Sequence, residues 1–431
     1  MTNRITLNAV EVCQNTVTYQ YSITEGLSPY FCKGSPFFVE YMVDGIPLDL
    51  QQVPVSILAI PFVCNVLPIV WLTDSELVVP ELDKDFYSSI PEFKQGYINM
   101  HKDAAFQGTI SVGKIVENTP AVTGRSACFF SGGVDAWCTL TRHLEEKPDL
   151  IAVWGADIQY DNVSGWDILR NALEESAHDL SLPFITVHSS FRKFINEAAL
   201  DNAFFPILHD GWWHGAQHGI GLIGHAAPCN YLRGVTTQYI AASFSPEDGA
   251  LSCASWPTID NFVQYSGCKT VHDAFIQRQE KIEQIIRYRR QNHTDIKLHV
   301  CWQSVGGKNC CHCEKCYRTI MGIVLEGDTA SQYAFPESDW SYSAMRDFMR
   351  EHLAIPFDPV VAKYWKQLQF TFSKSRDMLR TKPYYNDIKW IETFDFDHPE
   401  RYWKRRLKRA AGYPRIFARK VKGKIKRILG R

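Results

Sequence analysis

The chain of 431 residues lacks the two features that would send it into a membrane or out of the cell. Its N-terminal stretch alternates polar and apolar residues without a basic head and an apolar core, so we expect no secretion signal. The most apolar run, residues 57–72, is shorter than the ~20 residues of a membrane-spanning helix and contains Pro61, Asn65 and Pro68. We therefore expect a cytoplasmic protein in which residues 57–72 form a buried helix.

The sequence also lacks the cysteine pattern of a secreted protein. It has 13 cysteines, an odd number, and five of them lie between Cys301 and Cys316 while the other eight are scattered. A secreted disulfide framework instead shows an even set of cysteines in a short chain. The pattern is typical of a reduced protein with one metal site.

Acidic residues are absent from the C-terminal end of the chain. Residues 401–431 hold fourteen Lys or Arg and no acid, which leaves residues 1–400 with 32 basic and 47 acidic side chains, a net charge of −15. Such a body repels polyanions, so we expect contacts with an anionic membrane surface or nucleic acid to run through the basic tail or a local patch. Apolar residues are interleaved with the tail's charges, as in a basic amphipathic segment, and the alternative is a solvated end.

Length and composition indicate more than one domain. At about 150 residues per domain the chain holds two or three, and its 45% hydrophobic content supports a sizeable core. The oligomeric state is left open. We expect an N-terminal α+β accessory domain of unknown role over residues 1–122, an α/β domain over residues 123–327, a helical region over residues 328–400 and a basic tail over residues 401–431.

The expected α/β domain alternates between strand-like and helix-like segments. Strands separated by helices favour βαβ units and a parallel sheet with flanking helices. The strands are expected at residues 127–130, 150–154, 184–189, 251–256 and 297–302, and the helices at residues 135–146, 166–180, 212–226 and 272–290.

The first of these strands ends in Ser131-Gly132-Gly133, and Asp135 follows at the start of a helix. A strand that turns into a helix in this way presents backbone N–H groups and the positive end of the helix dipole at the carboxyl edge of the sheet. The glycines let an anion approach the backbone, Ser131 adds a hydroxyl donor, and Asp135 could hold Mg²⁺ against phosphates. The alternative is an ordinary glycine turn between strand and helix.

A second motif, further along the chain, has the spacing of a metal site. Cys301 is followed after eight residues by Cys310, and Cys313 and Cys316 follow at intervals of two residues. Four thiolates so spaced can close a tetrahedral Zn²⁺ shell, with a helix starting near Glu314 anchored by the metal. Two alternatives remain: a group of buried or redox-active thiols, and competition as ligands by Cys311 and His312.

The glycine loop resembles the S-G-G-x-D-S motif of the PP-loop ATP pyrophosphatases, which split ATP into AMP and pyrophosphate and use the AMP to activate a carbonyl or carboxyl oxygen. The resemblance implies an adenine nucleotide alpha hydrolase-like fold with ATP and Mg²⁺ as cofactors, and Ser131 and Asp135 as catalytic residues. Ala136 departs from the motif, where the family often has Ser. The resemblance implies that the nucleotide is bound by Ser131, Gly132, Gly133, Val134 and Asp135.

Together, the loop and the cysteine motif resemble 7-cyano-7-deazaguanine synthase, the nitrile-forming enzyme of queuosine biosynthesis, over about residues 124–325. The resemblance implies an ATP-dependent ligase that forms a C–N bond by activating a small-molecule acid for attack by ammonia or an amine. It also places Trp154 and Gly155 near the nucleotide. The alternative function is a non-catalytic nucleotide-binding scaffold with a zinc-stapled fold.

Other segments depart from that family or favour a structural role. The family's substrate-binding segments are only loosely matched, by residues 228–230 with Arg233 and by residues 264–268. His214 and His218 share one helical face, but the Glu of an H-E-x-x-H motif is absent, so we expect packing near the pocket rather than metal binding. The identity of the acid and of the amine donor is left open.

Overall fold

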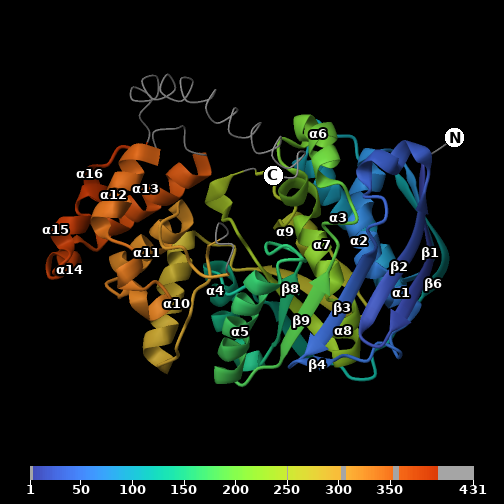
Figure 1. Cartoon of the computed structure of the whole chain (residues 1–431), viewed down its shortest axis with the longest axis horizontal. Helices are drawn as coiled ribbons and strands as arrows, with labels where there is room; N and C mark the ends of the chain where they lie inside the picture. The colour runs from blue at the N-terminus through green and yellow to red at the C-terminus, as the bar shows by residue number, and fades with distance from the viewer. Residues whose placement is uncertain (1–2, 250, 302–306, 353–358, 397–431) are drawn as a thin grey trace, which may run out of the picture. The chain divides into compact units, whose positions relative to one another are not determined.

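The computed structural model describes residues 3–249, 251–301, 307–352 and 359–396. The chain divides into two compact units, Met1–Asn309 and Cys310–Arg431, coloured from blue to yellow and from orange to red in Figure 1. Within the described ranges, no helix combines the length and the apolar character needed to cross a membrane.

The first unit is built on one sheet of twelve strands (Figure 1). From edge to edge the strand order is β11-β12-β10-β7-β8-β9-β3-β2-β1-β5-β6, and β4 pairs with β3. The strands are β1 Arg4–Cys13, β2 Thr16–Ile23, β3 Phe37–Val43, β4 Ile46–Pro47, β5 Glu76–Asp83, β6 Thr109–Val116, β7 Arg125–Phe129, β8 Asp149–Trp154, β9 Phe184–Ser189, β10 Val235–Ala241, β11 Gln264–Tyr265 and β12 Cys268–Asp273.

Five adjacent strands of this sheet run parallel, in the order β9-β8-β7-β10-β12. Numbered along the chain they read 3-2-1-4-5, the order of a doubly wound α/β sheet, so the expected α/β class is confirmed. In such a sheet the second and third strands lie on one side of the first strand, and the fourth and fifth strands lie on its other side. In doubly wound sheets ligands bind outside the carboxyl ends of the strands at this switch point, which here falls between β7 and β10.

Three of the expected strands form, and two do not. β7, β8 and β9 lie where the sequence predicted them, but residues 251–256 and the described part of residues 297–302 have no strand structure. In the second segment, the Asn309 side chain accepts from the N–H of Val300 at 3.0 Å and donates to the carbonyl of Leu298 at 2.7 Å. These backbone groups would otherwise be needed for hydrogen bonds to a neighbouring strand. The fourth and fifth parallel strands are instead β10 and β12.

The strand β10 escaped prediction because it is rich in polar residues. Gln238 is fully buried within it, and donates to the Thr270 hydroxyl of β12 at 2.9 Å, a polar pair that replaces apolar packing. The start of the helix expected at residues 272–290 was also wrong, since β12 runs to Asp273 and the helix begins at Arg278.

The N-terminal strands extend the same sheet. β3 pairs antiparallel with β9 along residues 39–43 and 185–189, and β2, β1, β5 and β6 follow outward from it. The boundary expected near residue 122 therefore does not coincide with a break in the sheet. Continuity of this kind fixes the N-terminal region firmly against the parallel strands.

Helices of the first unit pack against these strands and against each other. The predicted apolar helix is confirmed as α2, in which Ile60 to Trp71 are all buried. α4 packs on α10 and on β7 and β10, and α2 packs on α7 and β5. The helices are α1 Val55–Leu58, α2 Ile60–Leu72, α3 Lys84–Met100, α4 Val134–His143, α5 Val163–Asp179, α6 Glu197–Leu208, α7 His218–His225, α8 Ala227–Arg233, α9 Pro257–Asp260 and α10 Arg278–Asn292, with a π-helical turn at Trp213–Gln217.

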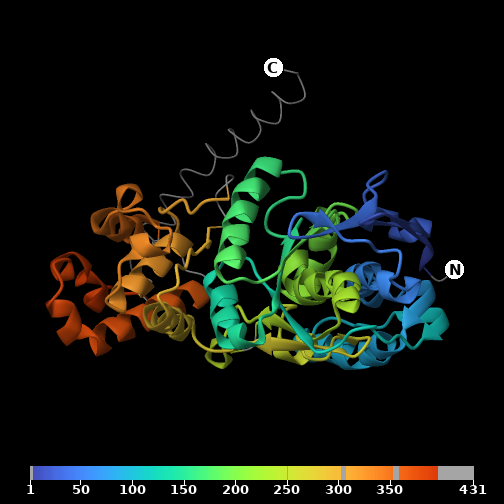
Figure 2. The ribbon, with the colours of Figure 1, turned by 90° about the horizontal axis from the view of Figure 1, so that it is seen from below.

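The second unit is helical over its described residues (orange to red in Figures 1 and 2). Trp365 is buried in its core and donates from Nε1 to Glu314 Oε1 at 2.8 Å, which ties α13 to the start of α11. The helices are α11 Glu314–Leu325, α12 Tyr342–His352, α13 Pro359–Lys374, α14 Arg376–Arg380, α15 Tyr385–Ile388 and α16 Trp390–Thr393.

Candidate functional site at the carboxyl edge of the sheet

The Ser131–Gly133 loop leaves β7 at the carboxyl edge of the parallel strands, between β10 and β8. The loop starts close to the sheet, because the N–H of Phe130 still donates to the carbonyl of Ile151 at 2.8 Å. Helix α4 then begins at Val134, with Gly133 as an N-cap that offers no side chain to the first-turn amides. Amides of a helix N-terminus are thus placed at the carboxyl end of β7, next to β10.

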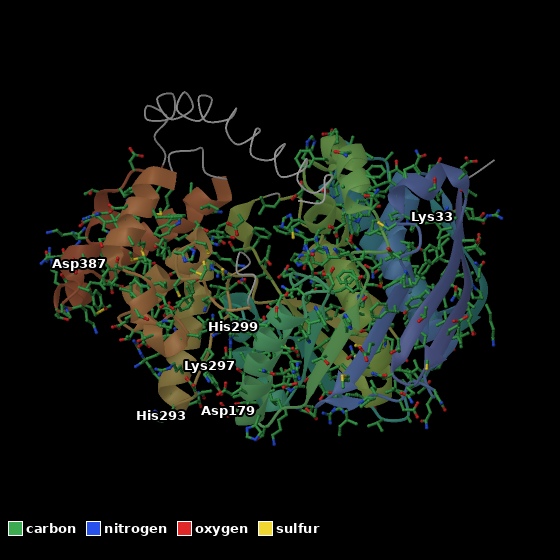
Figure 3. The ribbon with its side chains drawn as sticks, viewed as in Figure 1. Lys33, Asp179, His293, Lys297, His299 and Asp387 are labelled. Carbon is green, nitrogen blue, oxygen red and sulfur yellow. The ribbon has the colours of Figure 1, made fainter. Side chains whose placement is uncertain are left out.

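Gly132 is required by the local geometry of this loop. Its φ of +73° is a left-handed conformation, and a Cβ there would lie 2.8 Å from Leu173 Cδ2 and 3.3 Å from His299 Cβ. The segment that carries Lys297 and His299, both labelled in Figure 3, runs along the loop. The N–H of His299 donates to the Gly132 carbonyl at 2.7 Å, and Trp137 Nε1 donates to the Lys297 carbonyl at 3.0 Å. These bonds tie residues 297–299 to the loop and to α4.

Asp135 projects from the first turn of α4 and meets two cations of α10. Its Oδ1 lies 2.9 Å from Lys281 Nζ, and its Oδ2 lies 3.2 Å from Arg278 Nη1. Lys281 also donates to the carbonyl of Ala242, directly after β10, at 2.5 Å. The side chains of Lys281 and Arg278 are only 1% and 8% exposed, so their positive charges are held close to Asp135 at the start of α4.

Lys281 and Arg278 were missed by the sequence analysis. They stand three residues apart on α10, and in sequence they look like the exposed charges of an ordinary surface helix. Their burial follows from the contact between α10 and α4, which no short-range pattern reveals. The available signal was their place just after the fifth parallel strand, where side chains point to the ligand-binding edge of the sheet.

The remaining loop residues differ in what they present. Ser131 is exposed, so its hydroxyl is open to a ligand. Val134 and Ala136 are 1% and 4% exposed, so their side chains belong to the core and only their backbone faces the loop. If residue 136 were Ser, its hydroxyl would therefore belong to a buried side chain.

Trp154 ends β8 and Gly155 follows it, but their environment explains both residues without a nucleotide. Trp154 stacks on His188 with centroids 3.8 Å apart and on Trp166 at 5.5 Å. Gly155 has a φ of +111°, and a Cβ there would lie 2.0 Å from the carbonyl oxygen of Ser189. Their predicted contact with a nucleotide stays a prediction.

Residues 228–230 and 264–268, the loose matches to family substrate segments, are brought together in the core. Asn230 Nδ2 donates to the Tyr265 hydroxyl at 2.9 Å and to Gln238 Oε1 at 3.0 Å, and all three residues are fully buried. Arg233 bonds instead to the buried carboxylate of Asp149. These residues form a buried polar network that stabilises the core.

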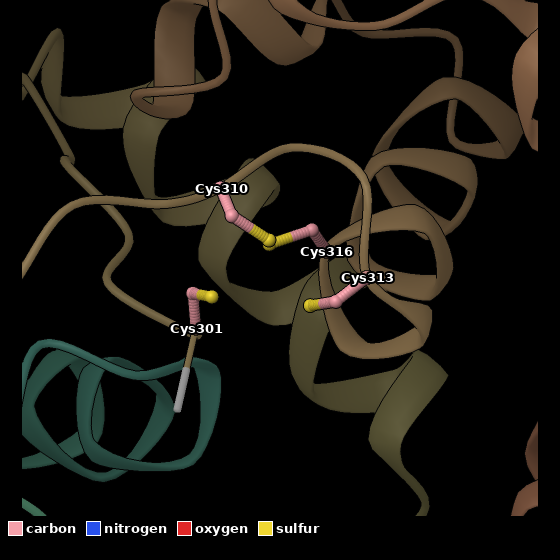
Figure 4. Close-up of side chains that lie close together, drawn as sticks. All are labelled: Cys301, Cys310, Cys313 and Cys316. Carbon is pink, nitrogen blue, oxygen red and sulfur yellow. The ribbon is translucent and has the colours of Figure 1, made fainter. Parts of the chain in front are cut away.

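The four cysteines of the second motif form a cluster (Figure 4). The Sγ atoms of Cys301, Cys310, Cys313 and Cys316 all lie within 4.8 Å of one another, and those of Cys310 and Cys316 are 3.9 Å apart. A tetrahedral shell with Zn–S bonds of ~2.3 Å has sulfur atoms about 3.8 Å apart. The cluster could therefore bind a metal, and its spacing and donor set fit Zn²⁺.

The competing ligands in the cysteine motif stay outside this cluster. Among the described residues, Cys311 and His312 do not join any group placed to hold a metal ion, and His312 is exposed. α11 begins at Glu314, as the sequence predicted, and Cys313 is its N-cap. Cys316 in its first turn therefore links the cluster directly to this helix.

The chain matches no family model, no curated protein and no solved structure. The basic tail predicted to contact anionic partners, residues 401–431, lies outside the described residues.

Proposed function

We propose that the chain is an ATP-dependent adenylating enzyme of the PP-loop type, which converts ATP to AMP and pyrophosphate and activates a carboxylate or carbonyl for attack by ammonia or an amine. The observation that carries this proposal is the place of the Ser131–Gly133 loop at the switch point of a 3-2-1-4-5 parallel sheet. Lys281 and Arg278 support it, since phosphates need positive charge at this edge.

In the proposed reaction, a carboxylate oxygen of the substrate attacks the α-phosphorus of ATP, and pyrophosphate leaves with the electron pair of the broken P–O bond. The amides at the start of α4 and the Ser131 hydroxyl donate to phosphate oxygens. Lys281 and Arg278 neutralise the charge that develops on the leaving group. The amine then attacks the acyl carbon and AMP leaves, so no covalent enzyme intermediate is needed.

Two metal ions belong to this proposal. Mg²⁺, when bound with ATP, would supply charge neutralisation to the phosphates. Asp135 is the residue that would hold it, which requires this carboxylate to exchange at least one of its two cationic neighbours for the metal. Zn²⁺ in the four-cysteine cluster would have a structural role, because four thiolates leave no open position for a substrate.

The test is the release of pyrophosphate and AMP from ATP in the presence of small carboxylic acids, among them a 7-carboxy-7-deazapurine. The full-length chain should release both products in an acid-dependent manner, and Asp135→Ala should lose this activity while it remains folded. Asp377→Ala is the control, since the Asp377 side chain is 97% exposed in the second unit. Tight ATP binding without turnover would instead favour the non-catalytic scaffold.

A further inference from the structure

A short stretch of chain, residues 297–301, connects the two motifs of the candidate site. At its end, Cys301 contributes its thiol to the four-cysteine cluster (Figure 4). Two residues earlier, the N–H of His299 donates to the carbonyl of Gly132 in the glycine loop at 2.7 Å. The same stretch of backbone therefore contacts the glycine loop and supplies a ligand atom to the cluster.

The contact between this stretch and the glycine loop involves both glycines. A Cβ at Gly132 would lie 3.3 Å from Cβ and from Cδ2 of His299, and a Cβ at Gly133 would lie 3.6 Å from the His299 carbonyl oxygen. Trp137 of α4 adds a hydrogen bond from Nε1 to the carbonyl of Lys297 at 3.0 Å. Because the N–H, the carbonyl and the side chain of His299 all lie against the loop, a shift of this stretch would displace the loop as well.

The side chain of Asn309 holds the same stretch in place. Its Oδ1 accepts from the N–H of Val300 at 3.0 Å, and its Nδ2 donates to the carbonyl of Leu298 at 2.7 Å. One amide thus bonds to the two residues on either side of His299. Leu298 and Val300 are only 1% and 3% exposed, so loss of the amide would leave buried backbone groups without these partners.

The four-cysteine cluster adjoins both partners in this contact. Cys301 directly follows the residues that Asn309 holds, and Cys310 directly follows Asn309 itself. Both cysteines belong to the cluster. A metal ion bound to the two thiolates would therefore keep the Asn309 side chain beside residues 298–300.

Asn15 provides a comparison for the simple structural effect of such an amide. Its Nδ2 donates to the backbone carbonyl of Tyr41 at 3.1 Å, so it also joins two segments through a side chain–backbone bond. Tyr41 belongs to β3, which β9 and β8 separate from β7 and its glycine loop. Removal of the Asn15 amide should therefore lower stability without an effect on the loop.

We propose that Asn309 is a positioning residue for the Ser131–Gly133 loop, and that it couples this loop to the metal content of the four-cysteine cluster. Asn309 holds residues 298–300, and His299 in turn holds Gly132, in the conformation that presents the first amides of α4 to phosphate. The cluster then supports nucleotide binding in addition to its structural role. The inference rests on the proposed function only for the identity of the ligand, ATP.

The coupling should change the affinity for ATP rather than the chemical step. Asn309 acts through His299 and Gly132, so its loss lowers the fraction of chains in which the loop is correctly placed. The apparent affinity falls with that fraction. In Asn309→Ala the KM for ATP should therefore rise, while kcat at saturating ATP should stay within about twofold of its original value.

The first test is hydrogen–deuterium exchange of the full-length chain, followed by mass spectrometry, without any nucleotide. Asn309→Ala should exchange faster than the unaltered chain in peptides that cover residues 131–134 and 297–300, and Asn15→Ala should not. Removal of the metal from the unaltered chain with EDTA should have the same local effect, and added Zn²⁺ should reverse it. If exchange at residues 131–134 ignores both changes, or speeds up equally in β1 and β2, the proposal is overturned.

The second test measures the affinity for ATP with Mg²⁺ by calorimetry, in chains with and without Zn²⁺. Asn309→Ala and removal of Zn²⁺ should each weaken binding about tenfold, as expected for the loss of one or two hydrogen bonds. The two changes together should weaken binding little more than either alone, because both act through one contact. Fully additive losses would contradict coupling through Asn309. The exchange experiment needs no ATP, so its failure is distinguishable from a failure of the proposed adenylation.

Discussion

Lys281 has a side chain that is only 1% exposed, and its Nζ lies 2.9 Å from Oδ1 of Asp135, at the start of the helix that follows the first parallel strand. A buried lysine is stable when its charge is paired. Here the partner is Asp135, the acid that follows the glycine loop. The sequence pattern indicated Asp135 but not Lys281, and the two side chains form one ion pair. ATP phosphates bound at this position would lie next to both Asp135 and Lys281.

Lys281→Met should weaken ATP binding by roughly 10- to 100-fold, because one charge-assisted hydrogen bond to phosphate contributes about 1.5–3 kcal/mol. Methionine keeps the length and apolar stem of lysine and removes the charge. Lys84→Met is the control, since Lys84 is a half-exposed lysine paired with Glu117 on a different part of the unit. Titration of both variants with ATP checks the prediction, and equal affinities would remove Lys281 from the site.

The four-cysteine cluster should hold one zinc per chain. Cys313→Ser should lower the zinc content and the unfolding temperature before it changes any chemistry, because the metal would fix the start of α11. Cys311→Ser is the matched control, since this buried cysteine is a close neighbour outside the cluster. Metal analysis of protein purified without chelator measures the outcome, and a chain that contains no zinc contradicts the assignment.

Acid should destabilise the first unit through His225. Burial lowers the pKa of His225 to about 4, although its bond to the Gly221 carbonyl opposes the shift. Because the folded pKa lies below the ordinary value of 6.5, the stability is fully present above pH 6.5 and is lost as the pH falls toward 4, by about 3 kcal/mol. The neutral ring donates to Gly221 and accepts from the Ser189 hydroxyl at 2.8 Å.

Urea unfolding at pH 7, 6 and 5 checks this prediction. His225→Gln should be less stable at pH 7 and should lose less stability between pH 7 and 5 than the unaltered chain. Parallel pH dependences for the two proteins would show that another group carries the acid sensitivity.

Deletion of residues 401–431 should leave zinc content and ATP affinity unchanged, because the residues proposed for both lie elsewhere. Binding to vesicles with anionic lipid should weaken strongly, since each basic residue near the surface contributes up to ~1 kcal/mol. Co-sedimentation of the full-length and shortened proteins with such vesicles, beside a salt titration with RNA, measures the change. Identical behaviour of the two proteins would indicate a solvated tail.

The part of the fold that the sequence revealed is the part set by short-range pattern. The strand before Ser131 and the helix after it follow from an apolar run, two glycines and an acid, and α2 follows from its length and apolarity. The cysteine cluster follows from spacing alone, because a tetrahedral shell limits how far apart its ligands can stand.

Long-range pairing explains what the sequence did not reveal. The sequence did not indicate β10 because the strand contains the polar residue Gln238. The Gln238 side chain is satisfied by donating to Thr270 of β12, a strand that follows later in the chain. Lys281 was hidden because its burial depends on the packing of α10 against α4. Sites that assemble from separate elements leave no local signature.

The most direct test of the central claim is exchange of labelled pyrophosphate into ATP by the full-length chain. Adenylation is reversible while the acyl-adenylate stays bound, so a substrate acid without an amine should support exchange, and Asp135→Ala should abolish it. The unaltered chain should catalyse acid-dependent exchange. Stoichiometric ATP binding with no exchange, across a panel of acids that includes 7-carboxy-7-deazapurines, would contradict the proposed adenylation.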